Sequence, residues 1–271
     1  MIKNNSVLVV IFFLFLIGFR IAYDFLNGIE YHYEEAQYWV WSQNPSLSYL
    51  TKGPFVASII SLSNSIFGKS YLGLKFFSLL AYIGTIIFIA YSSIALKKDK
   101  NIGTTALLIT GLSPALFFLG GVASTDAYLF FFWSLVLFGY IKFTLNKDVR
   151  WFYFIALATG LGLLTKLSMA LLPISILIYF LFTEYRKYFY SIHLYLSALL
   201  AIMIASPIVI WNIDNDWLTL SHEMGHLVSG TPSNNPEILL MTMIVTIPSA
   251  CLLYTSPSPR DRTRSRMPSS A

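Results

Sequence analysis

Cysteine and charged residues are what this sequence has least of. Only 11% of its 271 residues are charged, and Cys251 is its single cysteine. An ordinary soluble domain has roughly 25% charged residues, so this composition excludes a soluble globular protein. Because no cysteine precedes Cys251, the chain before it cannot form a disulfide or a thiolate metal site.

The positive net charge does not indicate nucleic-acid binding, because much of it comes from one short segment. The formal net charge is +5, but the last 21 residues contain four arginines and one aspartate. The other 250 residues carry a net charge of only +2. A surface that binds nucleic acid needs a larger basic excess, and we expect no nucleic-acid partner.

Residues 251–271 have a composition unlike anything before them. The apolar stretch that leads to Ala250 stops abruptly, and the following segment, rich in Ser, Pro and Arg, resembles a translated sequencing adapter. We expect residues 251–271 to be an artefact of this kind, with a disordered basic tail as the alternative, and exclude them from the fold prediction. The gene product is then expected to continue beyond Ala250.

Apolar residues are abundant: 56% of the chain is hydrophobic, and the mean hydropathy is +0.66. An apolar run of about 18 residues or more can cross the roughly 30 Å hydrocarbon core of a bilayer as a helix. The sequence therefore predicts an all-α, polytopic transmembrane helix bundle with about eight spans in residues 1–250. The predicted spans are Val7–Tyr23, Tyr71–Leu96, Ile102–Leu119, Ala127–Leu145, Trp151–Leu164, Ala170–Phe182, Ile192–Ile210 and an incomplete one from Glu237.

A long polar and aromatic stretch, Asp24–Ser70, separates the first two spans. Two short amphipathic segments within it, Glu34–Ser42 and Pro54–Phe67, are predicted to be helices that lie on the membrane surface. Proline is favoured in the first turn of a helix, so Pro54 suits the start of the second segment.

The basic residues between spans predict the orientation. The clusters around Lys3, Lys98, Lys147 and Arg186 all fall on one side of the membrane if the spans are counted as above. Cytoplasmic loops carry an excess of lysine and arginine, so this side is expected to be cytoplasmic. The stretch Asp24–Ser70 then faces the outside.

Two adjacent carboxylates, Glu34 and Glu35, start the first surface helix. Adjacent helical positions point about 100° apart, so these side chains are expected to serve different partners. The alternative is that they complement the helix dipole. Further along, Lys52 precedes the predicted start of the second surface helix, an arrangement that suits a phosphate; the alternative is a lysine that extends to lipid headgroups.

Two more charged residues lie where outer loops meet apolar spans. Asp126 re-enters the membrane at a depth where a carboxylate is costly unless it is paired or faces water, although a helix N-cap explains it almost as well. Lys166 is a lone cation between two spans, and it could pair with Asp126 or with an anionic lipid substrate.

One motif points to another chemistry. His222, Glu223 and His226 form a His-Glu-x-x-His pattern, which on a helix presents two imidazoles to zinc with the glutamate as a base. A catalytic zinc usually has three protein ligands, and only Glu237 offers a third. The sequence therefore predicts no metal site, and a membrane-embedded zinc metalloprotease is kept as the alternative function.

Six motifs follow one another along the chain: Glu-Glu-Ala-Gln-Tyr-Trp at 34–39, Tyr-Leu-Thr-Lys-Gly-Pro at 49–54, Ile-Phe-Gly at 66–68, Ala-Ser-Thr-Asp-Ala at 123–127, Gly-Leu-Gly-Leu-Leu-Thr-Lys at 160–166, and Trp-Asn at 211–212 with Asp-Trp-Leu-Thr at 216–219. Taken in this order, they resemble those of the GT-C membrane glycosyltransferases, in particular the bacterial branch similar to protein O-mannosyltransferases and to the lipid A aminoarabinose transferase. The similarity covers nearly all of residues 1–250, which would then be the N-terminal part of a membrane glycosyltransferase domain.

The resemblance implies an inverting sugar transferase that uses a polyprenyl-phosphate donor. It implies that Glu34 orients or deprotonates the acceptor hydroxyl, that Lys52 contacts the phosphate of the donor, and that Asp126 corresponds to the acid of the family's second outer loop. With these residues we predict Glu35 as a further catalytic residue and Lys166 as a further contact to the donor phosphate. In that family the acidic pair usually starts with aspartate, so Glu34 departs from the pattern by one methylene. The implied acceptor is a lipid, a glycan or a protein, and the implied location is the bacterial inner membrane with the active site on the periplasmic side. No cofactor is predicted, and assistance by a divalent cation is left open.

Overall fold

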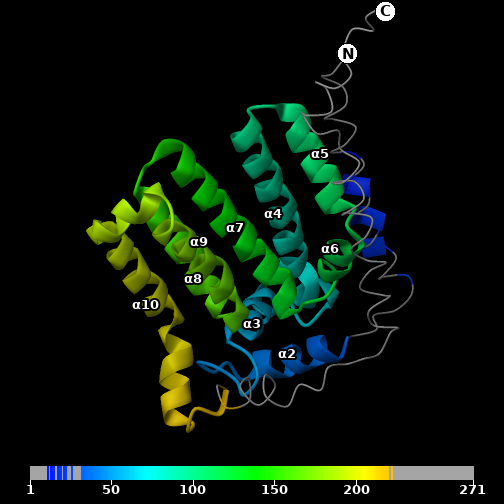
Figure 1. Ribbon diagram of the computed structural model, residues 1–271. Coiled ribbons are helices and arrows are strands. Elements are labelled where there is room, and N and C mark those ends of the chain that lie inside the picture. The colour runs from blue at the N-terminus through cyan, green and yellow to red at the C-terminus, as the bar shows by residue number, and fades with distance from the viewer. Residues whose placement is uncertain are drawn as a thin grey trace, which may run out of the picture.

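The computed structural model describes residues 32–219 and 221, and before them residues 11, 13–15, 17–19, 21, 22 and 26. Its regular elements are all helices, as predicted (Figure 1). The α-helices are α2 (Tyr33–Gln43), α3 (Phe55–Phe67), α4 (Tyr71–Lys97), α5 (Lys100–Gly111), α6 (Pro114–Leu119), α7 (Thr125–Asn146), α8 (Arg150–Leu163), α9 (Leu171–Leu181) and α10 (Ile192–Asp214). Two 3-10 helices, η1 (Leu167–Ala170) and η2 (Glu184–Tyr190), flank α9.

Three of these helices, α4, α7 and α10, are long and apolar enough to cross a membrane. The segment formed by η1 and α9 becomes a fourth candidate when it is joined to η2, although the two parts are bent by 106°. The chain is therefore a multi-pass membrane protein. Two of the other predicted spans need correction.

The predicted span Ile102–Leu119 is not one helix. It divides into α5 and α6, because Pro114 has no backbone N–H and pushes the preceding Ser113 into an extended conformation. The predicted span Trp151–Leu164 is found as α8, whose 14 residues reach about 21 Å and so fall short of the bilayer core. The described positions between 11 and 26 are helical, in agreement with the first predicted span. The incomplete span from Glu237 lies outside the described residues.

Both predicted surface helices are present. Helix α3 buries Val56, Ala57, Ile60 and Ser63, which follow one face, and it packs against α2 and α4. Helix α2 lies across one end of the bundle (Figure 1). Its Tyr38 is buried in the main hydrophobic core, together with Leu74 of α4 and Phe132 of α7. This core fixes α2 and α3 relative to the long helices.

The long helices approach one another closely through small residues. A side-chain carbon on Gly160 of α8 would meet Ile204 of α10, and one on Gly139 of α7 would meet Phe154 and Ile155 of α8. Small residues at such crossings permit the close helix packing found in membranes.

The loops divide between two ends of the bundle (Figure 1). The α4–α5 and α7–α8 connections and η2 lie at one end, and the α6–α7 and α8–α9 connections lie at the other, next to α2. The first end holds the basic residues Lys98 and Lys147, each in the left-handed conformation that ends its helix. The second end holds the predicted site residues.

Candidate active site

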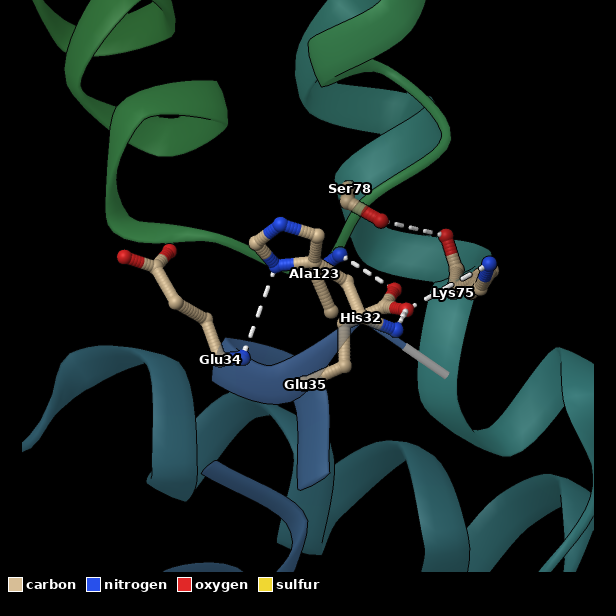
Figure 2. Close-up of polar contacts among 6 residues, drawn as sticks. All are labelled: His32, Glu34, Glu35, Lys75, Ser78 and Ala123. Atoms are coloured by element: carbon tan, nitrogen blue, oxygen red, sulfur yellow. Dashed lines mark hydrogen bonds and ion pairs between the residues drawn. The ribbon is translucent and has the colours of Figure 1, made fainter. Parts of the chain in front are cut away.

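The first turn of α2 directs Glu34 and Glu35 to different surroundings (Figure 2). His32 is the N-cap of α2. Its ring Nδ1 accepts a hydrogen bond from the backbone N–H of Glu34 at 3.4 Å, and its backbone N–H donates to Oε2 of Glu35 at 3.1 Å. Glu34 is half-buried, and its carboxylate points away from that of Glu35. Their predicted divergence is therefore confirmed.

Glu35 is fully buried and is engaged at both oxygens. Its Oε1 accepts a hydrogen bond from the backbone N–H of Ala123 at 2.8 Å, and its Oε2 lies 3.5 Å from Nζ of Lys75. The side chains of Glu35 and Lys75 are 1% and 11% exposed. The carboxylate thus joins α2 to α4 and to the loop before α7, and it faces no open space.

Sequence reasoning missed Lys75. This residue lies one turn into a predicted apolar span, and a lone charge at such a position usually has a partner or a function. That signal alone was enough to single it out. Only the fold, however, brings Lys75 next to Glu35.

Asp126 and Lys166 form an ion pair at the same end of the bundle. Asp126 lies in the first turn of α7, where Ser124 is the N-cap and accepts from the N–H of Ala127. Lys166 follows α8, and its Nζ lies 2.8 Å from Oδ1 of Asp126. The side chain of Lys166 is 34% exposed, and that of Asp126 is 40% exposed. The sequence left two partners open for Lys166, and the structure gives it Asp126.

Tyr38 lies near the carboxylates of Glu34 and Asp126. Sequence reasoning missed this residue too. Burial raises the pKa of Tyr38 well above its usual range, and the negative charges of Glu34 and Asp126 act in the same direction. A hydrogen bond with the side chain of Thr125 partly opposes this shift. The Tyr38 hydroxyl therefore stays protonated near two carboxylates. Its only signal in the sequence was its spacing of one helical turn from Glu34.

The loop that carries Lys52 is joined to the turn that carries Lys166. The backbone N–H of Phe55 donates to the carbonyl of Leu164 at 3.1 Å. The backbone at Gly53 is so close to the same carbonyl that any side-chain carbon there would collide with it. Lys52 is half-buried. These two contacts bring the loops of both predicted phosphate-binding lysines together.

The Lys52 loop is also held from the end of α10. The hydroxyl of Thr219 donates to the carbonyl of Tyr49 at 3.2 Å. Thr219 is placed by Asn212, whose Oδ1 accepts from the Thr219 N–H at 3.1 Å. Between them the chain turns sharply, with positive φ at Asp216 and Trp217. The Trp-Asn and Asp-Trp-Leu-Thr motifs thus support the Lys52 loop.

Stacked aromatic rings stiffen the other side of this loop. The rings of Trp41 and Tyr49 are stacked with centroids 4.4 Å apart, and the Tyr49 hydroxyl donates to the carbonyl of Trp41. Burial also raises the pKa of Tyr49. The loop is therefore tied to α2, α8 and α10, and Lys52 is held at a defined place.

The residues of the zinc motif, His222, Glu223 and His226, lie outside the described residues, as does Glu237. Within residues 32–219, no three His, Cys, Asp or Glu side chains gather in a way that could hold a metal ion. The absence of a metal site and the part played by a divalent cation remain predictions.

One family model and two relatives match the chain. Residues 51–211 match the family described as dolichyl-phosphate-mannose-protein mannosyltransferase. The lipid A galacturonosyltransferase RgtD of Rhizobium johnstonii is 25% identical over 222 residues, which cover 77% of this chain and 45% of that protein. An uncharacterized protein of Aquifex aeolicus is 27% identical over 157 residues, or 58% of this chain and 32% of its own length. The chain thus spans less than half the length of both relatives. No solved structure matches it significantly.

Proposed function

The chain belongs to the dolichyl-phosphate-mannose-protein mannosyltransferase family, which makes it a membrane glycosyltransferase, and we propose that it moves a sugar from a polyprenyl-phosphate donor to an acceptor hydroxyl. The observation that carries this proposal is the gathering of two carboxylates and two lysines at one end of the bundle. Glu34, Tyr38 and Asp126 lie together, and the loops of Lys52 and Lys166 are in direct contact.

The proposed reaction is a direct displacement at the anomeric carbon, with inversion. The acceptor oxygen forms a bond to this carbon as the bond from the carbon to the phosphate oxygen breaks, and polyprenyl phosphate leaves. The proton of the acceptor hydroxyl passes to a carboxylate, for which we propose Glu34. A positioned general base of this kind contributes roughly 100-fold to 10,000-fold to a rate.

We assign the phosphate of the donor to Lys52 and Lys166. Charge-assisted hydrogen bonds to an anion are among the strongest that a side chain can make. Both lysines follow or precede turns whose backbones are fixed, so the backbone at the two lysines would need little reorganisation when the phosphate binds. Cations there also stabilise the negative charge that develops on the leaving group.

Our proposal gives Glu35 a positioning role in place of the direct catalytic role predicted from its sequence. Its carboxylate is buried, paired with Lys75 and bonded to Ala123, so it acts through the groups that it holds. Asp126 keeps a direct role, because its carboxylate is partly exposed beside Glu34 and Tyr38.

We propose that the site faces the periplasm from the bacterial inner membrane. Lys97, Lys98, Lys147 and Arg150 lie at the opposite end of the bundle (Figure 1), and the excess of basic residues in cytoplasmic loops supports that orientation. The name of the relative in Rhizobium supports a lipid acceptor such as lipid A. No observation within residues 32–219 favours the zinc metalloprotease.

Transfer activity of the membrane-embedded chain tests the proposal, with polyprenyl-phosphate galacturonic acid as donor and lipid A as acceptor. We expect Glu34→Gln to lower kcat by at least about 100-fold, and Lys52→Ala to raise the KM for the donor by about tenfold or more. The matched controls are Glu184→Gln and Lys98→Ala at the other end of the bundle, which should leave both constants unchanged. Full activity of Glu34→Gln and Lys52→Ala would refute the assignment.

A further inference from the structure

Lys166 is already occupied in this structure. Its ammonium is held by Asp126 at 2.8 Å, although the proposed function requires it to meet a phosphate. An ammonium group has three N–H donors, so the phosphate can either share Lys166 with Asp126 or replace Asp126.

The ion pair between Asp126 and Lys166 differs from the one between Glu35 and Lys75 in a way that permits exchange. Both side chains of the first pair are more than a third exposed, whereas those of the second are almost completely buried. A solvated pair contributes little to stability, because water screens the attraction and competes for both charges. Breaking a buried pair leaves an uncompensated charge in the interior. Of the two, only the pair of Asp126 and Lys166 can open at low cost.

We propose that Asp126 and the phosphate of the donor compete for Lys166, so that donor binding releases the Asp126 carboxylate toward the acceptor side of the site. This inference rests on the proposed function and deepens it. The phosphate of the donor is a diester and carries one negative charge, as a carboxylate does, but its several acceptor oxygens let it compete for an ammonium group. The polyprenyl phosphate that leaves is a monoester with more negative charge, so the attraction to Lys166 grows as the sugar is transferred. The long side chain of a lysine swings easily between two such partners.

The surroundings of the pair fit such an exchange on both sides. On the lysine side, the Lys52 loop touches the turn before Lys166 through Gly53 and Leu164, so the loop of a second cation lies next to Lys166. On the carboxylate side are Glu34 and the protonated hydroxyl of Tyr38. A released Asp126 carboxylate would stand beside Glu34, where an acceptor hydroxyl must be bound.

The exchange makes the binding order part of the mechanism. Before the donor arrives, Lys166 neutralises Asp126, and the acceptor side lacks one of its two carboxylates. After the donor arrives, both carboxylates are available to orient the acceptor hydroxyl. Donor binding thus precedes productive acceptor binding, and the site is less able to activate water when it is empty.

Competition gives a signature that a structural ion pair does not. Removing the charge of Asp126 frees Lys166, so Asp126→Asn should bind polyprenyl phosphate more tightly than the wild type while it transfers sugar more slowly. If the pair only stabilised the fold, the same substitution would weaken binding or leave it unchanged. Asparagine has nearly the same shape as aspartate, so the change removes only the charge, together with its small interaction with the helix dipole.

The test is a binding titration of the purified full chain in detergent with undecaprenyl phosphate, followed by tryptophan fluorescence, with undecaprenol as the uncharged control. We expect Asp126→Asn to lower the Kd about threefold, which is the size set by an exposed pair, and Lys166→Met to raise it about tenfold. In the double variant Asp126→Asn/Lys166→Met, the loss of the aspartate should bring no gain. Asp126→Glu keeps the charge and should retain the wild-type Kd.

The outcomes separate the two proposals. If the wild type binds undecaprenyl phosphate no better than undecaprenol, the proposed function fails. If it prefers the phosphate but Asp126→Asn binds equally or less tightly, the competition is refuted and the proposed function stands. Asp126→Ser provides the same comparison if the asparagine variant is unstable, because serine is also a good residue near a helix start.

Discussion

The carboxylate of Glu35 accepts a hydrogen bond from the backbone N–H of Ala123, 88 residues further along the chain, at 2.8 Å. This bond ties the first turn of α2 to the loop that leads into α7. Glu34 comes immediately before Glu35, and Asp126 comes three residues after Ala123. The spacing of the two proposed active carboxylates therefore depends on a third carboxylate that is buried beneath them.

The pair of Glu35 and Lys75 should show strong thermodynamic coupling. Lys75→Met leaves the Glu35 carboxylate buried without its counter-charge, and we expect this variant to lose about 3 kcal/mol of unfolding free energy. The double variant Glu35→Gln/Lys75→Met removes both charges and keeps an oxygen for Ala123, so it should recover most of that loss. Denaturant unfolding in detergent measures the cycle. Additive losses in the double variant would show that the two side chains act independently.

Gly53→Ala should separate the two lysine loops. The new methyl group would collide with the carbonyl of Leu164, and because this neighbour is backbone, the loops themselves must move. We expect a destabilisation of about 2 kcal/mol together with a higher KM for the donor, measured in the transfer assay. Gly18→Ala is the matched control, since a side-chain carbon there meets open space. An unchanged donor KM in Gly53→Ala would show that the contact does not set the geometry of the phosphate site.

Thr219→Val tests the support of the Lys52 loop by α10. Valine has the shape of threonine without the hydroxyl, so the substitution leaves the carbonyl of Tyr49 without its donor. Leaving such a buried group unpaired costs about 1 to 2 kcal/mol, which a melting experiment should detect as a lower Tm. Ser221→Ala removes an exposed hydroxyl from the same segment and should have almost no effect. Equal Tm values for the two variants would contradict the assigned role of Thr219.

Alkaline pH should destabilise the protein partly through Tyr38. Burial raises the pKa of Tyr38 above its value in the unfolded chain, so the folded state disfavours the phenolate. The contribution is fully present below about pH 10, the ordinary tyrosine pKa, and is lost as the pH rises above it. We expect Tyr38→Phe to have a flatter decline of Tm between neutral and alkaline pH than the wild type. Tyr33→Phe alters an exposed tyrosine of the same helix and should decline like the wild type.

Hydropathy predicted the long helices well because a helix that crosses a bilayer needs one property, a long run of apolar residues. The predicted spans Tyr71–Leu96, Ala127–Leu145 and Ile192–Ile210 correspond to α4, α7 and α10, with ends that differ by at most four residues. The break within Ile102–Leu119 was missed, since an average over many residues hides the effect of one proline. The backbone consequence of Pro114 is local and steric, and it requires reading the residue before it.

The sequence named candidate site residues one by one and offered Asp126 as one of two partners for Lys166, but it did not predict the pairing of Glu35 with Lys75. Sequence patterns identified Glu34, Lys52, Asp126 and Lys166 as chemically unusual positions. They could not show that Glu35 forms a buried ion pair with Lys75, because that pair depends on how α2 crosses the end of α4. Tyr38 was missed for a similar reason: an aromatic residue in a surface helix is unremarkable until the fold brings two carboxylates around it.

The contact between Gly53 and the carbonyl of Leu164 is made by main-chain atoms on both sides. Its length is set by the hydrogen bond from the backbone N–H of Phe55 to the carbonyl of Leu164, and it depends little on the size or polarity of neighbouring side chains. Side chains around the contact can be substituted while the separation between the Lys52 and Lys166 loops stays the same, provided that position 53 remains glycine. For protein engineering, residues around this contact can therefore be substituted to alter the preference for a sugar or an acceptor while the separation of the Lys52 and Lys166 loops is retained.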